Sequence, residues 1–143
     1  MEIAQLIAGR NPSDIVTCEA GQPVREAVAI LAEKRIGALP VMEDGRIAGI
    51  FSERDVIYRM ADEGTACLEK LVGQVMTAPA ITVEKSSKVD EALSLMTKRR
   101  IRHLPVTDNG AFAGFVSIGD LVKSRIDEVE HEAAAMRDYI QTA

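Results

Sequence analysis

Two stretches of the chain carry the same order of apolar and polar positions. Residues 16–57 align with residues 81–122 without a gap, and 15 of the 42 aligned pairs are identical. So many identities in one register indicate that a structural unit has been duplicated. We therefore expect two units of one fold.

Each unit predicts the order β-α-β-β-α. In the first unit a short strand at 15–18 precedes an amphipathic helix from Val24, whose apolar residues recur at i, i+3, i+4 and i+7. Two strands follow at 38–42 and 47–51, and the second unit repeats all these elements 65 residues later. A second helix then closes each unit.

Short polar signals mark the turns and helix starts. The strands of the two hairpins are joined by Asp44-Gly45 and Asn109-Gly110, which are strong signals for a tight turn. The second helix of each unit begins at a Ser with an Asp three residues later, a pattern that resembles a capping box.

These elements predict an α+β fold in which two units pack sheet to sheet with pseudo-two-fold symmetry. A unit of about 60 residues buries little surface alone, so we expect one shared core. An N-terminal helix is predicted within residues 2–10, and a short helix within the linker 58–80. We divide the chain into residues 1–75, with the N-terminal helix and linker, and residues 76–143, with a long C-terminal helix.

The C-terminal segment predicts a helix that runs well past the second unit. Its apolar residues alternate in steps of four and three, which is the a/d seam of a heptad repeat. They are Val122, Ile126, Val129, Ala133, Met136 and Ile140. The seam is buried either against the chain's own core or against a partner chain. We favour the partner, because the unit itself needs no helix of this length.

Composition and charge exclude several classes of protein. The net charge of −5 argues against a broad basic surface for nucleic acid, and 47% apolar residues argue against disorder. The longest apolar run, 27–32, is too short to span a membrane, and the N-terminus does not resemble a signal peptide. Cys18 and Cys67 lie far apart without a metal-binding or redox spacing. We therefore expect a cytoplasmic protein with two reduced cysteines.

Motifs for catalysis or metal binding are absent from the sequence. His103 and His131 lack the spacing of metal ligands, and there is no phosphate-binding loop or nucleophile elbow. We expect neither enzyme activity nor a metal nor a required cofactor.

The most distinctive polar pattern is Gly-φ-φ-Ser-x-x-Asp, in which φ is apolar. It occurs at 49–55 and at 114–120. In a purely structural interpretation, Ser caps the helix and Asp complements the positive end of its dipole. The same groups at a strand end can also hold a ribose diol and a phosphate. Both interpretations stay open at this point.

A basic run precedes the second strand of the second unit, from Lys98 to His103. Complementing the helix dipole explains Lys98 and Arg99. Arg102 and His103 lie beyond the helix, at the start of the strand, and suit an anion such as phosphate.

The doubled motifs resemble a tandem cystathionine-β-synthase (CBS) domain pair, or Bateman module. The first copy reads Arg-Ile-Gly-Ala-Leu-Pro-Val and then Gly-Ile-Phe-Ser-Glu-Arg-Asp; the second reads Arg-Ile-Arg-His-Leu-Pro-Val and then Gly-Phe-Val-Ser-Ile-Gly-Asp. The resemblance covers residues 13–124. More specifically, the chain is similar to stand-alone bacterial CBS pairs. It implies a non-catalytic regulatory module for an adenosyl ligand: AMP, ADP, ATP, NAD(H) or S-adenosylmethionine. It also implies a homodimer in which two pairs meet face to face.

The resemblance implies two ligand clefts, each built from both units. In cleft one, Asp55 would hold the ribose hydroxyls, while Ser52, Arg54 and Arg102 would face phosphate, with His103 as a further candidate. Adenine would lie between Ala80, Ile81 and Pro105. The whole predicted set is Ile50, Ser52, Arg54, Asp55, Ala80, Ile81, Arg102, His103 and Pro105.

Cleft two would keep the ribose carboxylate and lose the guanidinium groups. Its predicted set is Ile15, Val16, Gly37, Ala38, Pro40, Phe115, Ser117 and Asp120. Gly37 and Ala38 stand where cleft one has Arg102 and His103, and Gly119 stands in place of Arg54. A lost charge-assisted contact of roughly 1.5–3 kcal/mol weakens a phosphate-bearing ligand by roughly tenfold or more.

We therefore expect an asymmetric pair. Cleft one should prefer a nucleotide with phosphates. Cleft two is either empty or takes an adenosyl group whose charge points to solvent, and a dinucleotide spanning both clefts is a third arrangement.

Other functions stay open beside the sensor. A dimeric interaction scaffold without a ligand would use Ser and Asp only as helix caps, and a small enzyme is the least favoured class. A regulatory module without a catalytic domain implies a regulated protein partner on another chain, which the sequence does not name.

Overall fold

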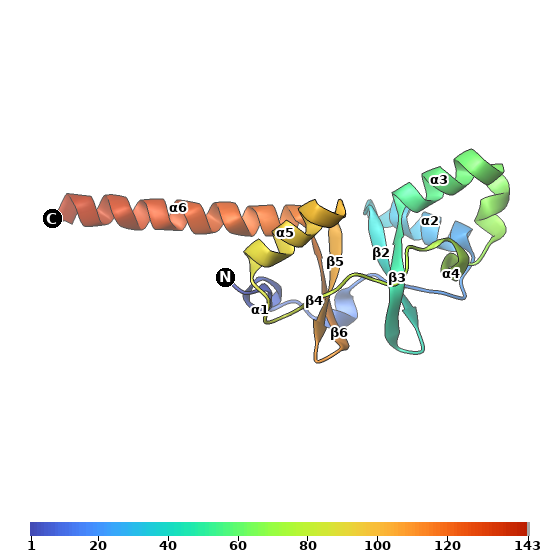
Figure 1. Cartoon of the computed structure of the whole chain (residues 1–143), viewed down its shortest axis with the longest axis horizontal. Coiled ribbons are helices and arrows are strands. Elements are labelled where there is room, and N and C mark those ends of the chain that lie inside the picture. Colours follow the sequence, from blue (N-terminus) through green and yellow to red (C-terminus); the bar gives the residue numbers. More distant parts are fainter. Residues whose placement is uncertain (143) are drawn as a thin grey trace.

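Two β-α-β-β-α units lie side by side in the computed structural model, which describes residues 1–142, and a long helix projects from one end (Figure 1). The first unit contains β1 (Cys18–Glu19), α2 (Val24–Lys34), β2 (Ala38–Glu43), β3 (Arg46–Ser52) and α3 (Glu53–Glu63). Its sheet has the order β1-β2-β3, with β1 parallel to β2 and β2 antiparallel to β3.

The second unit repeats this arrangement. It contains β4 (Val83–Glu84), α5 (Val89–Arg99), β5 (His103–Asp108), β6 (Ala111–Ser117) and α6 (Ile118–Thr142). The sheet order is β4-β5-β6 with the same strand directions. The two sheets meet where β3 contacts β6. The predicted α+β fold of two packed units is confirmed.

Both hairpins turn at the predicted dipeptides. Asp44 and Asn109 have φ of 52°, and Gly45 and Gly110 have φ of 76° and 84°. Two successive positive φ values define the tight turn whose twist matches that of the flanking strands.

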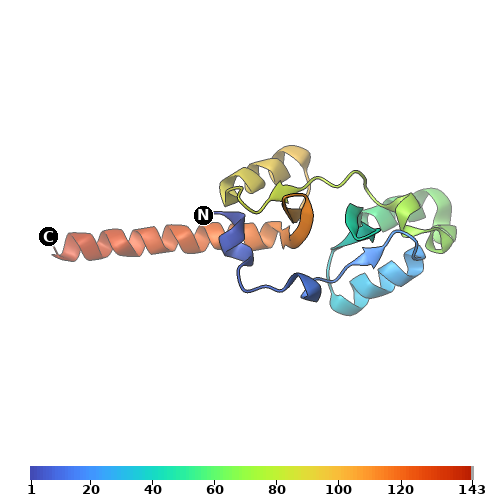
Figure 2. The same ribbon diagram turned by 90° about the horizontal axis from the view of Figure 1, so that it is seen from below.

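The first strand of each unit is shorter than predicted and begins later. Only Cys18–Glu19 and Val83–Glu84 pair with a neighbouring strand. The residues before each strand cross between the units on opposite sides of the molecule (Figure 2). The extended stretches predicted at 15–18 and 80–83 are therefore mostly crossing segments.

Short helical elements complete the chain. The linker between the units holds η2 (Gly64–Glu69) and α4 (Val72–Val75) rather than one short helix, and the N-terminal segment holds α1 (Ile3–Ile7) and η1 (Pro12–Asp14). The bond between Ala78 and Pro79 is cis.

The predicted single shared core is wrong: the buried side chains form two clusters, one in each unit. The first comprises Cys18, Val24, Ala27, Leu31, Leu39, Val41, Phe51, Val72 and Val75. The second comprises Ile3, Val83, Val89, Ala92, Met96, Leu104, Val106, Val116 and Leu121. Each unit therefore has a hydrophobic core of its own.

The N-terminal helix packs on the second unit, although it precedes the first unit in the chain. Ile3 lies in the second core, its N–H donates to the Ser87 carbonyl at 2.8 Å, and the Val89 N–H donates to the Met1 carbonyl at 2.9 Å. The division of the chain at residue 75 stays a prediction. It groups α1 with the first unit, whereas α1 packs on the second unit.

The heptad seam of α6 is not covered by the chain's own core. Val122, Ile126, Val129, Met136 and Ile140 are 42–66% exposed. The buried residues of α6, Leu121 and Ser124, lie on another face. The alternative in which this seam packs on its own core is therefore wrong for residues 1–142, and dimerisation stays a prediction.

Gly49 provides a stability test, because β3 lies very close to the linker there. The Ile50 N–H donates to the Thr77 carbonyl at 3.0 Å, and a Cβ on Gly49 would lie 2.6 Å from that same carbonyl oxygen. We expect Gly49→Ala to lower the free energy of unfolding by about 1–3 kcal/mol, since backbone must move to admit the methyl group.

Gly114, the repeat equivalent of Gly49, is the matched control. The nearest atom to a Cβ there would be the end of the flexible Ile7 side chain, at 3.2 Å, and the next contacts, at 3.6 Å, are of ordinary length. Gly114→Ala should therefore cost clearly less in urea denaturation, and equal losses for the two variants would contradict the account.

Candidate functional site: a cleft between the two units

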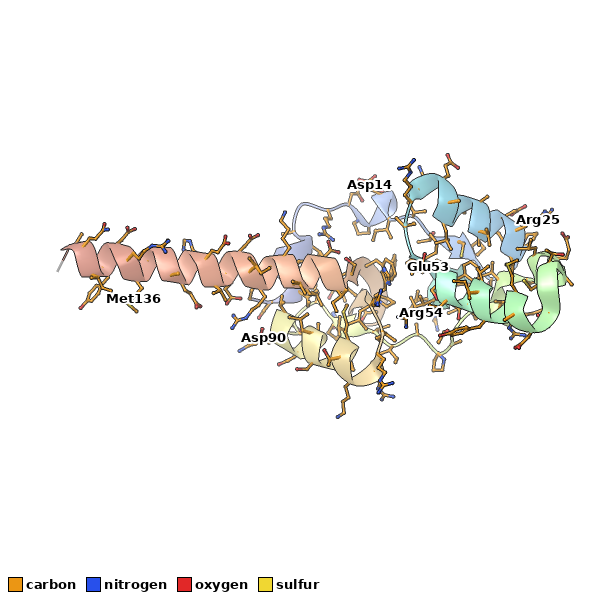
Figure 3. The ribbon with its side chains drawn as sticks, turned by 90° about the horizontal axis from the view of Figure 1, so that it is seen from above. Asp14, Arg25, Glu53, Arg54, Asp90 and Met136 are labelled. Atoms are coloured by element: carbon orange, nitrogen blue, oxygen red, sulfur yellow. The ribbon has the colours of Figure 1, made fainter. Side chains whose placement is uncertain are left out.

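A cleft of about 240 Å³ opens between the two units. One wall is the end of β3 with the start of α3, and the other is the start of β5; residues 77–81 of the linker complete it. Figure 3 shows Glu53 and Arg54 at the start of α3, on the side that faces the second unit.

Most residues predicted for cleft one line this cleft. They are Ile50, Ser52, Arg54, Asp55, Ala80, Ile81, Arg102 and His103. Asp55 and Arg102 therefore come together from different units. Pro105 is not among the lining residues, because it is buried in β5 opposite Phe115. The roles of these residues in binding stay predictions.

A capping box fixes the carboxylate side of the cleft. Asp55 Oδ2 accepts hydrogen bonds from the Ser52 N–H at 2.9 Å and from the Ser52 hydroxyl at 3.1 Å, and Ser52 Oγ accepts from the Asp55 N–H at 3.4 Å. Asp55 Oδ1 accepts from the Thr77 hydroxyl at 3.0 Å. The structural interpretation of Ser-x-x-Asp is thus confirmed. It does not exclude a ligand, since a carboxylate has about four acceptor sites and three are used.

The basic side of the cleft is held by the backbone at the start of β5. The Arg102 carbonyl accepts a hydrogen bond from the Ile118 N–H at 2.8 Å, which ties this residue to the start of α6. In the first unit the equivalent hydrogen bond runs from the Glu53 N–H to the Gly37 carbonyl, at 3.0 Å. Each strand start is therefore fixed to the helix that ends its own unit.

The charges in the cleft suit an anion that also carries hydroxyl groups. Three arginines, Arg54, Arg100 and Arg102, and two acidic residues, Glu53 and Asp55, line it. Guanidinium groups bind phosphate through paired hydrogen bonds, whereas a carboxylate accepts hydrogen bonds from hydroxyls.

His103 lines the cleft and also contacts a residue predicted for cleft two. Its ring stacks on Phe115, a residue predicted for cleft two, with the centroids 5.5 Å apart and an interplanar angle of 14°. Burial lowers the pKa of His103 below 6.5, and Arg102 acts in the same direction. The carboxylates of Asp120 and Glu53 oppose this shift of the His103 pKa. Near pH 7 the imidazole is therefore mainly neutral and would contact a phosphate as a hydrogen-bond donor.

Sequence reasoning missed several lining residues. They are Glu53, Tyr58, Thr77, Pro79, Arg100 and Ile101. Arg100 and Ile101 had a signal, since both are identical in the two copies and directly precede Arg102. Thr77 and Pro79 belong to the linker. The one sequence signal for them was that they lie close to Ala80, which was predicted for the cleft.

Two residues predicted for cleft two, Gly37 and Ala38, line this same cleft. A Cβ on Gly37 would lie 3.8 Å from His103 Cε1 and 3.6 Å from Glu53 Oε1. The absence of a side chain at Gly37 thus leaves room where the two units approach each other.

Two further residues predicted for cleft two, Ser117 and Asp120, lie where β6 ends and α6 begins. Asp120 Oδ2 accepts from the Ser117 N–H at 2.9 Å, and Ser117 Oγ accepts from the Asp120 N–H at 3.1 Å, which repeats the capping box. Asp120 Oδ1 lies 3.5 Å from Nη2 of Arg10, which comes from the N-terminal segment. In the same N-terminal segment, η1 contacts β6. Asp120 therefore has a guanidinium beside it that the repeat did not predict.

The other predicted residues of cleft two lie close to β2 and the N-terminal crossing. Ile15 directly follows η1, Val16 packs against the first core, and Pro40 is buried in β2. Whether these residues form a second ligand site stays a prediction.

Comparison with known proteins identifies the family. The sequence profile described as "CBS domain" matches residues 11–62 and 72–127, one match for each unit. The chain belongs to the CBS-domain family. The predicted resemblance to a tandem CBS pair is therefore confirmed, and the first and second units are its two CBS motifs.

Similar proteins have the same two-motif architecture. A putative signal-transduction protein with CBS domains from Burkholderia ambifaria is 40% identical, with a TM-score of 0.81, over 89% of this chain and 95% of that one. The mitochondrial CBS domain-containing protein CBSX3 of Arabidopsis thaliana is 36% identical over 129 residues. That match covers 87% of this chain and 63% of the length of CBSX3.

Two more distant structures were solved with adenosyl ligands. CBSX2 in complex with AMP is 24% identical, with a TM-score of 0.75, over 88% of this chain and 96% of that one. The CBS pair of MJ0100, in complex with 5′-methylthioadenosine and S-adenosyl-L-methionine, is 22% identical with a TM-score of 0.76, over 90% of this chain and 98% of that one. At these identities the likeness to this chain is one of fold.

None of the helices within residues 1–142 has the length and apolar character needed to cross a bilayer. In the same part of the chain, no three His, Cys, Asp or Glu side chains gather into a group able to hold a metal ion.

His103 predicts a dependence of stability on pH. A pKa that is lower in the folded state means that the unfolded chain takes up the proton first. The contribution of His103 is therefore retained above about pH 6.5 and is lost as the pH falls from there through the lowered pKa. When the pH is lowered from 7.5 to 5.5, we expect the Tm of the wild type to fall more than the Tm of His103→Gln. Parallel Tm curves for the two proteins would contradict the environment described for His103.

Proposed function

We propose that this CBS pair is a non-catalytic regulatory module that binds an adenine nucleotide in the cleft between its motifs. The observation that carries the proposal is the meeting of Asp55, from the first motif, with Arg102, from the second, in one cleft. The AMP complex of CBSX2 and the adenosyl complexes of MJ0100 support the ligand class.

In the proposed complex the ribose hydroxyls donate to Asp55 and the phosphates accept from Arg54 and Arg102. Ser52 is a further phosphate contact. The adenine ring lies on the apolar side of the cleft, beside Ala80 and Ile81.

The charge of the cleft favours nucleotides such as AMP, ADP, ATP or NAD(H) over S-adenosylmethionine. Three guanidinium groups attract phosphate and repel the positive sulfonium centre of S-adenosylmethionine, and the repulsion is strongest where water is partly excluded. S-adenosylmethionine is therefore the weaker candidate.

Ligand binding would act by drawing the two motifs together. Each motif has its own core, so the pair can change its relative packing without disrupting either core. A ligand that contacts both motifs stabilises the arrangement in which both contacts are made, and a protein partner would respond to that shift. We expect the protein in the cytoplasm, where its buried free cysteines, Cys18 and Cys67, stay reduced.

A ligand-free interaction scaffold is the second candidate. It is favoured by one observation, the completed capping boxes at both Ser52 and Ser117, which give Ser and Asp a structural role. The scaffold leaves the three arginines of the cleft without a function. Ligand titration distinguishes the two candidates.

Calorimetric titration with AMP tests the role of Arg102. Losing a charge-assisted contact of roughly 1.5–3 kcal/mol should weaken AMP binding by roughly tenfold or more in Arg102→Ala. Arg25→Ala is the control, because Arg25 lies on the first unit away from the cleft and pairs only at the surface with Glu69, at 3.6 Å (Figure 3). Unchanged AMP affinity in Arg102→Ala would remove this residue from the site, and no heat with any adenylate would favour the scaffold.

The two capping boxes allow the ribose contact to be separated from the capping role. Asp55→Asn and Asp120→Asn each weaken the same type of helix cap, and both should lower Tm. Only Asp55→Asn should also weaken AMP binding, because only Asp55 lines the cleft. Equal AMP affinity in the two variants would contradict the ribose contact. GMP, titrated in parallel, reports whether the base is recognised.

A further inference from the structure

The apolar seam of α6 lies on a different face of the helix from the buried residues Leu121 and Ser124. Leu121 and Ser124 are buried, and Ser124 Oγ lies 2.9 Å from Met1 Sδ. At 3.6 residues per turn, the seam lies about 120° around the helix from this buried face. Figure 3 shows Met136 on the part of α6 that extends beyond the other elements.

The residues of the seam occupy the a and d positions of a heptad repeat. The a positions are Ile126, Ala133 and Ile140, and the d positions are Val122, Val129 and Met136. Ile at two of the three a positions is typical of parallel dimers, whereas the d positions hold Val and Met in place of the usual Leu. The small Ala133 reduces packing at the centre, so the flanking charges carry more weight in choosing the partner and its direction.

The charges beside the seam are complementary for a parallel pair. Positions e are Lys123, Glu130 and Arg137, and positions g are Arg125, Glu132 and Tyr139. In a parallel, in-register pair each g residue faces the e residue five positions later in the other helix. Arg125 then faces Glu130 of the second copy, and Glu132 faces Arg137 of the second copy. Both contacts join opposite charges, and each occurs twice.

An antiparallel pair with full overlap brings like charges together. Lys123 then faces Arg137 of the second copy, and Glu130 and Glu132 each face themselves. Antiparallel registers shifted by one heptad avoid these contacts, but they bury only four of the six seam layers. The parallel register alone uses the whole seam without a like-charge contact.

The Glu132–Arg137 contact is the more informative of the two. Arg125 already has partners in its own chain, Asp90 at 3.7 Å and Glu128 at 3.4 Å. Within residues 1–142, Glu132 and Arg137 form no ion pair, and their separation of five positions places them too far apart around one helix to pair with each other.

We propose that α6 joins two copies of this chain as a parallel, in-register coiled coil. The two CBS pairs then lie at the same end of the coil. This arrangement is independent of the proposed ligand and gives a direction to the dimer.

Cysteine cross-linking tests the direction and register. A parallel, in-register pair places the two Ala133 residues in one layer, so Ala133→Cys should form a covalent dimer under mild oxidation. Ala135 lies on the opposite, exposed face, and Ala135→Cys is the matched control that should stay uncross-linked. The native cysteines do not interfere, because both are buried and burial raises the pKa of the Cys18 thiol to about 11.

The outcomes of cross-linking are distinct. A covalent dimer for Ala133→Cys alone supports the proposal. No cross-link at position 133, or equal cross-linking at 133 and 135, overturns it. Preferential cross-linking of Ala133→Cys to Val122→Cys or Met136→Cys, in mixed samples of the single variants, overturns it in favour of a shifted antiparallel pair.

A charge exchange tests the same interface without cysteines. Glu132→Arg should weaken the dimer several-fold in sedimentation equilibrium, because it places two arginines opposite each other. Glu132→Arg combined with Arg137→Glu should restore the wild-type dissociation constant. A monomeric wild type, or a double variant as weak as Glu132→Arg, would overturn the parallel register.

Discussion

The candidate site depends on the contact between β3 and β6, which sets the two CBS motifs against each other. This contact brings the start of α3, with its Ser52–Asp55 capping box, opposite the start of β5. Neither element makes a site alone: one supplies the Asp55 carboxylate, and the other supplies Arg102. Backbone bonds from Ile118 to Arg102 and from Glu53 to Gly37 hold the two walls in place.

Duplication followed by divergence makes the two halves of this arrangement unequal. Both motifs keep the capping box, because a helix that starts at a strand end needs its N–H groups satisfied whether or not a ligand is bound. The residues at the start of the second strand differ, Arg102 and His103 against Gly37 and Ala38. In the second motif the guanidinium beside the capping carboxylate comes instead from Arg10, outside the repeat. The phosphate-binding character that we propose therefore belongs to one cleft.

Local and repeated features were predictable from the sequence. The hairpin turns follow from Asp44-Gly45 and Asn109-Gly110, and the capping boxes follow from Ser-x-x-Asp, because each depends on neighbours within four residues. Most of the residues that line the cleft were reached through the doubled motifs. Contacts between segments far apart in the chain were not predictable. The packing of Ile3 in the second core, the two separate cores and the Arg10–Asp120 contact have no periodic signal, since tertiary packing alone decides them.

The most direct test of the central claim is a crystal structure of the protein grown with saturating AMP. The account predicts AMP between the two CBS motifs, with its ribose hydroxyls within hydrogen-bond distance of Asp55 and its phosphate in contact with Arg102. AMP bound elsewhere on the surface, or an unoccupied cleft at a concentration that saturates binding in solution, would contradict it.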